Sequence, residues 1–413
     1  MKTRIRIRST LHIWLALFLT VVAMPSWAQT FGHSVSGEVR DASTGKRLPQ
    51  ASITTPDGHE MTVTNADGEF TLKTLRKPSA IYVSCLGYNA TKVSLQGDDS
   101  KPLKIKLKPG TITLNEVIVN AMDPVEIVKE AVRKIPHNFS HDNELLRCFY
   151  RETTQKGRRY IYVAEAVTDL YKVGYNRFAG ADRVAIERGR RLVSVRRTDT
   201  LGAKIQGGPT LPIGLDLMKK QDMLLDEKEL ALYHLRMEVP VVENDRPQIV
   251  ISFSPLTRAD HVLYHGKMYI DRQTLAFSRI EMSLDMSDET RASEVILLRK
   301  PAGVRFRPRD FTVTVAYRYD GTTSRIHYMH TDVRFYCEWR RKLFASPYHV
   351  EAEMVVTDLL SSDAKPISGR STFSSRDSFY DKVAFFDDPD FWADYNIIEP
   401  TESLEHAIKK LKK

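Results

Sequence analysis

The chain is poor in cysteine. Cys85, Cys148 and Cys337 are its three cysteines, and no two of them form a C-x-x-C pair. A small, odd and widely spaced set argues against a disulfide framework and against a zinc knuckle. Cys85 and Cys148 stand in apolar stretches, where cysteine usually acts as a small core residue. A single disulfide among the three stays open.

Long apolar runs are equally scarce. One run, residues 11–24, follows four basic residues and precedes Pro25 and the small residues Ser26 and Ala28. This order predicts a secretory signal peptide, residues 1–28, cleaved after Ala28; a retained membrane anchor is the alternative. No other segment approaches the roughly 20 apolar residues that a spanning helix needs. We therefore expect no transmembrane helix in the mature chain.

The excess of positive charge is modest. The formal net charge is +9, and residues 1–28 hold four basic and no acidic side chains, which leaves +5 after cleavage. Because an exported protein rarely meets nucleic acid, we expect no nucleic-acid partner. The remaining charge points to anionic surfaces of the cell envelope or to no partner at all.

Motifs of catalysis are missing too. The sequence has no G-x-S-x-G elbow, no G-x-x-x-x-G-K-[ST] loop, no G-x-G-x-x-G and no H-E-x-x-H. A zinc carboxypeptidase is an alternative through His141 and Glu144, whose H-x-x-E spacing would need His261 or His265 as a third ligand. Such a short spacing arises easily by chance among 12 histidines, and the strands that follow do not suit that enzyme's βα pattern.

Carboxylate pairs offer a second route to catalysis. Glu165 and Asp169 lie four residues apart, so on a strand they would share a face and could form an acid/base pair. Asp285, Asp288 and Glu289 cluster in SLDMSDET. Most such groups are solvated charges at the edge of a sheet. We therefore expect no enzyme activity, no cofactor and no metal site.

Short alternating segments dominate residues 33–108. Runs of four to eight residues rich in Val, Ile and Thr are separated by Gly, Asp and Asn, which predicts a β-sandwich. The stretch TNADGEFTL, residues 64–72, does not fit a calcium loop. With Gly68 as the invariant glycine, the first and last ligand positions fall on Val63 and Thr74. The stretch instead predicts a tight turn between two strands.

A connector and a helix follow the sandwich. Residues 109–122 are expected to form the connector between the two domains. The next stretch, MDPVEIVKEAVRKIPHN, predicts a helix with Asp123 as N-cap, Pro124 as first residue and Glu126 as reciprocal capping partner. We expect Pro136 to end this helix.

Longer strands fill residues 123–398. Two hairpins are predicted, with turns at residues 271–274 and 320–321, and a further strand at 348–359. Candidate covers for the apolar face of this curved sheet are the first helix, a helical stretch around QDMLLDEKELALYHLRM and a C-terminal helix, residues 399–413. The expected fold is mainly β and multidomain. It has a seven-strand-type sandwich followed by an α+β domain with a curved antiparallel sheet and a few covering helices.

The first domain resembles a known family. SGEVRDASTGKRLPQASI, ADGEF, LGY and LNEVIV occur in the order found in the carboxypeptidase-regulatory-like domain, a transthyretin-like β-sandwich. The resemblance covers residues 33–118. In Gram-negative envelope proteins this domain is an N-terminal module without catalytic activity, and the resemblance implies the same here.

The second domain resembles the corresponding part of uncharacterised envelope proteins, through DPVEIVKEAVRKIPHNF, CFYRE, AEAVTDLY and DFWADYNIIEP. Its GKMYIDRQTLAFSRIEM hairpin is similar to a hairpin of lipoprotein-carrier-like half-barrels, whose curved sheet holds acyl chains against a helical lid. This resemblance implies a fold more than a function. Together the two resemblances imply a periplasmic or outer-membrane-associated protein.

Arginines gather in two runs, DRVAIERGRRLVSVRR and RKPAGVRFRPRD. Arginine binds phosphate or carboxylate with two hydrogen bonds, so lipid head groups or an acidic glycan are candidate ligands. The favoured alternative is that alternating arginines form the wet face of a strand. The candidate anionic-ligand patch comprises Arg188, Arg190, Arg191, Arg196, Arg197, Arg305, Arg307 and Arg309.

Aromatic residues gather near the C-terminus. A sugar-binding platform is one interpretation, and a clamp that fastens the C-terminal tail onto the core is the favoured one. The cluster comprises Phe385, Phe386, Phe391, Trp392 and Tyr395.

These patterns predict a non-catalytic exported cell-envelope protein that works as a binding or interaction module. The sandwich would dock to an envelope protein partner, and the concave side of the curved sheet would hold an apolar or amphipathic ligand. A structural scaffold or adhesion accessory without a small ligand is the second hypothesis. A zinc carboxypeptidase is the third.

Overall fold

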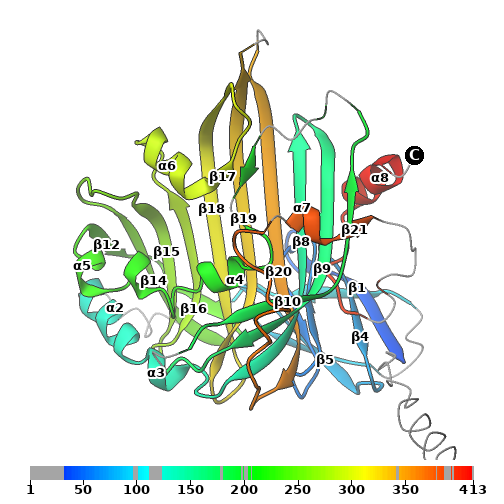
Figure 1. Ribbon diagram of the computed structural model, residues 1–413. Coiled ribbons are helices and arrows are strands. Elements are labelled where there is room, and N and C mark those ends of the chain that lie inside the picture. The colour runs from blue at the N-terminus through cyan, green and yellow to red at the C-terminus, as the bar shows by residue number, and fades with distance from the viewer. Residues whose placement is uncertain are drawn as a thin grey trace, which may run out of the picture.

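Figure 1 shows the computed structural model of the protein. It describes residues 32–95, 101–110, 123–176, 180–196, 199, 203–205, 207–340, 344–377, 379–385, 392 and 395–411. The predicted signal peptide and most of the connector lie outside these residues. Strands form a small N-terminal sandwich and one large curved sheet, so the predicted mainly β, multidomain fold is confirmed. No helix in the described part is long and apolar enough to cross a bilayer.

The sandwich has seven strands in two sheets, ordered β4-β1-β7 and β3-β2-β5-β6. Alternate side chains, among them Val39, Ile53, Phe70 and Ile81, meet in a core between the sheets, as strand geometry requires. The strands are β1 (His33–Asp41), β2 (Ser52–Thr54), β3 (Met61–Val63), β4 (Glu69–Thr74), β5 (Ala80–Ser84), β6 (Thr91–Ser94) and β7 (Leu103–Leu107).

A tight turn joins β3 to β4, as TNADGEFTL predicts. Asn65 Oδ1 accepts hydrogen bonds from the backbone N–H groups of Asp67 and Glu69, each at 2.9 Å. Gly68 has a φ of 71°, and a Cβ there would lie 2.8 Å from the carbonyl oxygen of Val39. Only glycine fits this position without strain. The stretch is therefore structural.

The second domain is built on a 12-stranded sheet of order β12-β14-β15-β16-β18-β19-β20-β8-β9-β10-β21, with β13 paired to β14. Neighbours are antiparallel except β10 and β21. The strands are β8 (Glu144–Lys156), β9 (Arg159–Lys172), β10 (Arg183–Val193), β12 (Tyr233–Met237), β13 (Val241–Glu243), β14 (Arg246–Pro255), β15 (Tyr264–Asp271), β16 (Phe277–Leu284), β18 (Val304–Tyr319), β19 (Ser324–Trp339), β20 (Ser346–Ser361) and β21 (Ala384–Phe385). Both predicted hairpins and the predicted strand at 348–359 are confirmed. A separate two-stranded sheet pairs β11 (Lys204–Ile205) with β17 (Leu297–Arg299).

One face of the large sheet is covered by short helices, and we call it the helix face. Side chains such as Tyr150, Met329 and Met354 share one apolar core with Val128 and Leu224 of the covering segments. Figure 1 shows the α4 and α7 segments lying across this face. The helices of the domain are α2 (Pro124–Arg133), α3 (Ile135–Asn138), α4 (Leu211–Gly214), η2 (Gln221–Met223), α5 (Glu227–Leu230), α6 (Glu289–Ile296), α7 (Phe379–Lys382) and α8 (Glu402–Leu411).

The first predicted helix is confirmed with two corrections. Asp123 caps α2 by accepting from the N–H of Val125 at 2.9 Å. Glu126 is not its reciprocal partner, because it pairs with Lys129 at 3.3 Å. Pro136 does not end the helix but lies in the first turn of α3, where its missing N–H leaves no bond unmade.

The second predicted helical stretch is wrong over its last part. Only η2 and α5 are helical, and Tyr233–Met237 is the edge strand β12. Tyr233 and Leu235 are buried while His234 and Arg236 are exposed. This period of two favours a strand paired with β14 over a helix.

The sandwich packs against the opposite face of the sheet, which we call the sandwich face. Val63 of β3 shares a small apolar cluster there with Phe149, Tyr328 and other strand residues. Polar contacts join the domains too, since Arg279 donates to Gln50 Oε1 at 2.6 Å. The predicted C-terminal helix is confirmed as α8, but it does not cover the helix face. Its first N–H, from Glu402, donates to Asp67 in the sandwich at 3.1 Å.

The C-terminal tail fastens the sandwich to the sheet. Asn396 exchanges two hydrogen bonds with the backbone of Lys73, at 2.6 and 2.9 Å. Trp392 packs edge-on against Phe149 with ring centroids 5.7 Å apart, and its Nε1 donates to Glu165 at 2.9 Å. The predicted aromatic clamp is confirmed at Trp392. Phe386, Phe391 and the side chain of Phe385 lie outside the described residues.

Candidate functional site

A cavity lies where the β2–β3 hairpin of the sandwich meets β18, β19 and β20, and we call it the junction pocket. Its volume is about 190 Å³, close to the size known to hold a benzene ring. Its polar wall contains Asp57, His59, Arg318, Asp320, Arg325 and His327. Its apolar wall contains Met61, Leu146, Ile326, Val356 and Leu359.

Arg318 gives the pocket a cation without an ion-pair partner in the described part of the chain. Its Nη2 donates to the carbonyl of Gly58 at 3.3 Å, and its Nη1 lies 3.9 Å from Met61 Sδ. Within the described residues, no carboxylate oxygen lies within 4.0 Å of this guanidinium. Burial lowers the pKa of Arg318, because a guanidinium removed from water without a counterion is costly. An anion in the pocket would supply the missing charge.

Gly58 allows the hairpin to approach Arg318. It has a φ of 73°, and a Cβ at this position would clash with Nη2 of Arg318. The neighbouring carboxylate is held within the turn, where Asp57 Oδ1 accepts from the hydroxyl of Thr55 at 2.6 Å and from the N–H of His59 at 3.2 Å. The turn therefore presents a carbonyl, not a carboxylate, to the guanidinium.

His327 reaches the pocket because of a β-bulge. Ile326 and Tyr328 pair with successive residues of β18, so His327 between them is the extra residue. Its Nε2 lies 3.0 Å from Ser52 Oγ, while its buried Nδ1 has no hydrogen-bond partner. Burial, with a contribution from Arg318, lowers the pKa of His327 to about 3. The imidazole is therefore neutral near pH 7, and it is too weak a base for proton abstraction.

The second guanidinium of the pocket is already neutralised. Arg325 Nε donates to Glu144 Oε1 at 2.6 Å, and its other end bonds to Asp320. Burial alone would raise the pKa of Asp320, but hydrogen bonds from the turn bring it down to about 2. Because Asp57 and Asp320 balance part of the positive charge, the pocket suits a monoanion beside Arg318 better than a polyanion.

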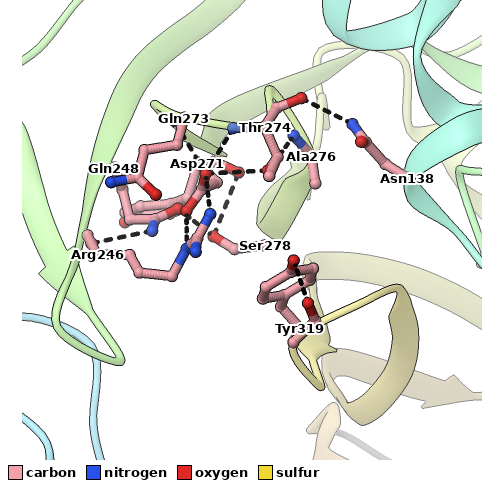
Figure 2. A network of polar contacts seen from close by, with 11 residues as sticks. Asn138, Arg246, Gln248, Asp271, Gln273, Thr274, Ala276, Ser278 and Tyr319 are labelled. Atoms are coloured by element: carbon pink, nitrogen blue, oxygen red, sulfur yellow. Dashed lines mark hydrogen bonds and ion pairs between the residues drawn. The ribbon is translucent and has the colours of Figure 1, made fainter.

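A second cavity, of about 280 Å³, adjoins the junction pocket across the β18–β19 turn, and Asp320 lines both. Figure 2 shows the polar network on its wall. Asp271 accepts from Arg246 at 2.5 and 2.7 Å and from the N–H and hydroxyl of Thr274 at 2.8 and 2.9 Å. Asn138 donates to the Thr274 carbonyl at 3.0 Å and so ties α3 to this turn. Both oxygens of the Asp271 carboxylate already accept hydrogen bonds, so the network is structural.

The helix face offers little room at the cavity beside Glu152 and Tyr162. That cavity has a volume of about 40 Å³, room for about two or three water molecules and too little for an acyl chain. Apolar side chains of the covering segments fill the neighbouring described part of this face. We therefore place the candidate ligand site at the junction pocket instead of on the helix face.

A buried lysine on the helix face is fully paired. Lys172 Nζ lies 2.6 Å from carboxylate oxygens of both Asp182 and Asp216. Tyr175 and Tyr317 donate to Asp216 at 2.8 and 2.9 Å. Burial alone would lower the pKa of Lys172, but the two carboxylates outweigh it and raise this pKa. The cluster is closed, so it has no group left to offer a ligand.

The first predicted arginine run lies on β10 and just beyond it. Arg188, Arg190 and Arg191 each lie over an aromatic ring from the C-terminal part of the chain, with Cζ 4.0 to 5.9 Å from the ring centroid. Arg196 is exposed, and Arg197 lies outside the described residues.

The second arginine run lies on β18. Arg305 and Arg307 pair with Glu338 at 4.0 and 2.8 Å, and Arg309 lies over the ring of Tyr336. Four strands, β19, β20, β8 and β9, separate β18 from β10 in the sheet. The structure does not bring the two runs together, and anion binding by either stays a prediction.

The residues considered for a zinc peptidase are engaged elsewhere. Glu144 accepts from Arg325, exposed His141 bonds to a backbone carbonyl, and His261 lies 2.9 Å from each of two other carboxylates. In the described part of the chain, these side chains do not gather into a group of three ligand atoms.

Glu165 and Asp169 share the sandwich face of β9, as predicted. Glu165 lies 2.8 Å from Arg151, and Asp169 lies 3.0 Å from Arg147. Burial alone would raise the pKa of Glu165, but Arg151 and Arg190 outweigh burial and lower it. A carboxylate with a lowered pKa is a poor general acid. Both residues act as ion-pair partners in this arrangement.

Asp332, His349 and Glu351 on β19 and β20 have metal-ligand spacing, with ligand atoms within 4.8 Å of one another. His349 Nε2 lies 2.8 Å from Asp332, whose other oxygen lies 3.2 Å from Arg334 Nε. The hydrogen bond with Asp332 raises the pKa of His349. Arg334 supplies positive charge to this group, and the hydrogen bond with Asp332 favours the charged form of His349.

Sequence patterning missed the residues of the junction pocket. In the sequence, Arg318 alternates with apolar residues such as Val315 and Tyr317, which places it on the opposite face of the strand and does not mark it as a site. The sandwich covers that position in the structure, and the bulge at His327 is visible only once β18 and β19 are paired. No local signal in either strand reports the docking of a domain whose hairpin lies some 260 residues earlier.

Comparison with known proteins identifies the first domain. Residues 35–119 match the family model of the CarboxypepD_reg-like domain, which confirms the resemblance found in the sequence. No curated protein matches the chain.

Among solved structures, a LolA superfamily protein from Nitrosomonas europaea is 12% identical, covers 58% of this chain and 96% of its own, and has a TM-score of 0.19. A DUF1329 family protein from Desulfovibrio piger is 10% identical, with coverage of 57% and 94% and a TM-score of 0.23. MucB, in complex with MucA, is 13% identical, with coverage of 59% and 100% and a TM-score of 0.18. With TM-scores this low, these similarities carry no argument about function.

Proposed function

We propose that the chain is a non-catalytic binding protein of the cell envelope whose junction pocket holds a carboxylate bearing a small apolar group. The observation that carries this proposal is Arg318, a largely buried guanidinium without a carboxylate partner. His327 stands beside it with an unpartnered Nδ1, and an apolar wall faces both.

The pocket can satisfy each part of such a ligand. One carboxylate oxygen would accept from Arg318, and the other would accept from His327 Nδ1 when the hydroxyl of Ser52 donates to Nε2. The apolar substituent would leave water for the wall that contains Met61 and Ile326. A volume of about 190 Å³ limits the substituent to a short branched chain or a single ring.

An envelope location is part of the proposal. Its support is the N-terminal order of basic residues, apolar run and small residues, which is typical of export. The CarboxypepD_reg-like domain contributes the hairpin that closes the pocket. In this protein the sandwich would therefore form one wall of the ligand site. A protein partner that binds there would contact residues of both domains.

The test is calorimetric titration of the purified protein with benzoate, isocaproate and acetate at pH 7, with benzamide as the uncharged analogue. We expect benzoate or isocaproate to bind, acetate to bind more weakly, and benzamide not to bind. Arg318→Met keeps much of the side-chain volume and removes the charge, and it should weaken binding at least about tenfold.

The matched control is Arg334→Met, which removes a guanidinium that is 59% exposed and paired with Asp332 on the same sheet face. It should leave the affinity unchanged. Equal binding of benzoate and benzamide, or benzoate binding that survives Arg318→Met, would contradict the proposal. Failure of all three carboxylates to bind would also overturn it and would favour a scaffold without a small ligand.

A further inference from the structure

The strand ends farthest from the junction pocket form a second surface. Three parts of the sheet lie side by side there: the β8–β9 hairpin, the end of β10 and the β19–β20 hairpin. Lys156 pairs with Tyr348, Cys337 with Ser346, and Val193 with Tyr162. Figure 1 shows β19 and β20 projecting beyond the neighbouring strands at this end. We call this the strand-tip surface, and its defining residues are Arg158, Val195, Arg196, Arg340 and Phe344.

Two apolar side chains stand out on the strand-tip surface. Phe344, next to the start of β20, is 82% exposed, and Val195, beyond the end of β10, is 90% exposed. Scattered exposed apolar residues are ordinary on a protein surface. An exposed aromatic ring on a projecting hairpin is different, because it can enter the interfacial layer of a membrane without any rearrangement of the sheet.

Unpaired cations surround these apolar side chains. Arg158 in the β8–β9 hairpin, Arg196 beyond β10 and Arg340 at the end of β19 are all exposed. In the described part of the chain none of the three has an ion-pair partner. Asp199, which pairs with the neighbouring Arg159 at 2.7 Å, is buried.

We infer that the strand-tip surface docks onto an anionic lipid bilayer. Cations near such a surface are attracted by its negative potential, while aromatic and aliphatic side chains enter the interface below the head groups. Phe344 lies next to β20 and Val195 lies beyond β10, and two strands, β8 and β9, separate β20 from β10 in the sheet. A bilayer accepts separate insertions, whereas a protein partner would need a fitted pocket for each.

This docking would fix the orientation of the protein. β18 runs 16 residues from the strand-tip surface to the turn beside the junction pocket, about 50 Å at the usual strand rise. The pocket would then open far from the lipid surface. The inference rests on the strand tips alone, so it does not depend on a ligand in the junction pocket.

The test is co-sedimentation with phosphatidylcholine vesicles, with and without 30 mol% (about one third) phosphatidylglycerol, a composition that gives a strongly anionic surface. All variants are compared in the same processed form, with the N-terminus read by mass spectrometry. We expect binding to the anionic vesicles that weakens with added salt. Arg158→Gln and Arg340→Gln should each weaken it about fivefold, and Phe344→Ser should weaken it by a similar factor.

Two variants serve as matched controls. Val239→Ser removes an apolar side chain with the same exposed fraction as Phe344, 82%, between β12 and β13. Arg133→Gln removes an exposed cation from α2. Both should bind vesicles like the wild type, and benzoate titration of every tip variant should be unchanged.

Three results would overturn the inference. These are equal binding to neutral and anionic vesicles, tip variants that bind like the wild type, and binding to polyglutamate-coated beads as tight as to anionic vesicles. The last result would assign the surface to an acidic protein partner. None of the three bears on the junction pocket, which the benzoate titration tests separately.

Discussion

Two cations of the second domain are removed from water in very different surroundings. Lys172, on the helix face, has carboxylate oxygens of two aspartates at 2.6 Å. Arg318, at the domain junction, contacts a carbonyl oxygen and a thioether sulfur, and no carboxylate oxygen of the described residues lies within 4.0 Å of it. A buried charge that is not compensated is costly. Lys172 is therefore a fully paired part of the core, whereas Arg318 has no ion-pair partner in the described part of the chain.

The difference teaches how to separate structural from functional polar groups in a chain without catalytic motifs. Burial of a charge does not by itself mark a site. Lys172 is more deeply buried than Arg318, yet its ammonium group already pairs with two carboxylates. The informative quantity is burial without a partner, at a place with room for one. By that measure the junction pocket stands apart from the helix face.

The largest effect should come from breaking the compensated centre. Lys172→Met leaves Asp182 and Asp216 buried beside each other without a cation, so we expect a loss of about 3–5 kcal/mol in the free energy of unfolding. Urea denaturation measures it. The half-exposed pair of Lys129 with Glu126 is the control, and Lys129→Met should cost no more than about 0.5 kcal/mol. Equal losses in the two variants would abolish the contrast.

A pH effect of intermediate size should arise at the junction. The pKa of His327 is about 3 in the folded chain, against an ordinary value of 6.5, so the unfolded chain binds a proton that the folded chain excludes. Stability is then full above pH 6.5 and falls as the pH drops toward 3. Between pH 7 and pH 5 the loss should be about 2 kcal/mol.

His327→Gln should remove this dependence on pH. His349 works in the opposite direction, because its pKa is raised and its contribution is lost as the pH rises. The comparison is therefore the slope of unfolding free energy against pH in the wild type and the variant. An unchanged slope would show that His327 is not excluded from protonation.

A smaller loss of stability is expected when glycines with positive φ are replaced, and two of them separate backbone strain from the steric clash with Arg318. Gly58→Ala is expected to lower the free energy of unfolding by about 1–2 kcal/mol. Gly58 has a φ of 73°, and a Cβ at this position would clash with Arg318. Gly45→Ala, with a φ of 71° and open space around it, carries the backbone cost alone. Only the first variant should also weaken benzoate binding. Parallel losses of binding would mean that the turn acts through general destabilisation.

The smallest expected change has the opposite sign to the first. Arg318→Met removes a charge without an ion-pair partner, so it should leave the free energy of unfolding unchanged or raise it by up to about 1 kcal/mol while it weakens carboxylate binding at least about tenfold. Thermal and urea unfolding measure it without ligand. A large loss of stability would show that Arg318 is as firmly compensated as Lys172.

Local sequence patterns predicted local structure well. The turn at Gly68 and the hairpins at Asp271 and Asp320 each depend on residues within a few positions, so composition and spacing were enough. The edge strand at Tyr233–Met237 was mistaken for helix because its period of two is short and a helix precedes it. Pro136 was placed at a helix end, although proline fits the first turn of a new helix equally well.

The candidate site could not be predicted in the same way. Arg318 alternates with apolar residues like any strand arginine, and what distinguishes it is a glycine turn in another domain. The two arginine runs were conspicuous in the sequence because they hold many arginines in few residues. In the structure, several of these arginines already contact aromatic rings or carboxylates. Compensation is a property of three-dimensional neighbours, and composition does not report it.

The bonds of Asn396 to Lys73 join residues 323 positions apart. The sandwich has its own core and can form as soon as its seven strands exist. The bonds to Asn396 need residues far along the chain, so this part of the docking has to wait until the strands of the large sheet have been synthesised. The junction pocket likewise needs β18, β19 and β20 in place before the hairpin of the sandwich can close it, so a chain that ends before β20 would lack it.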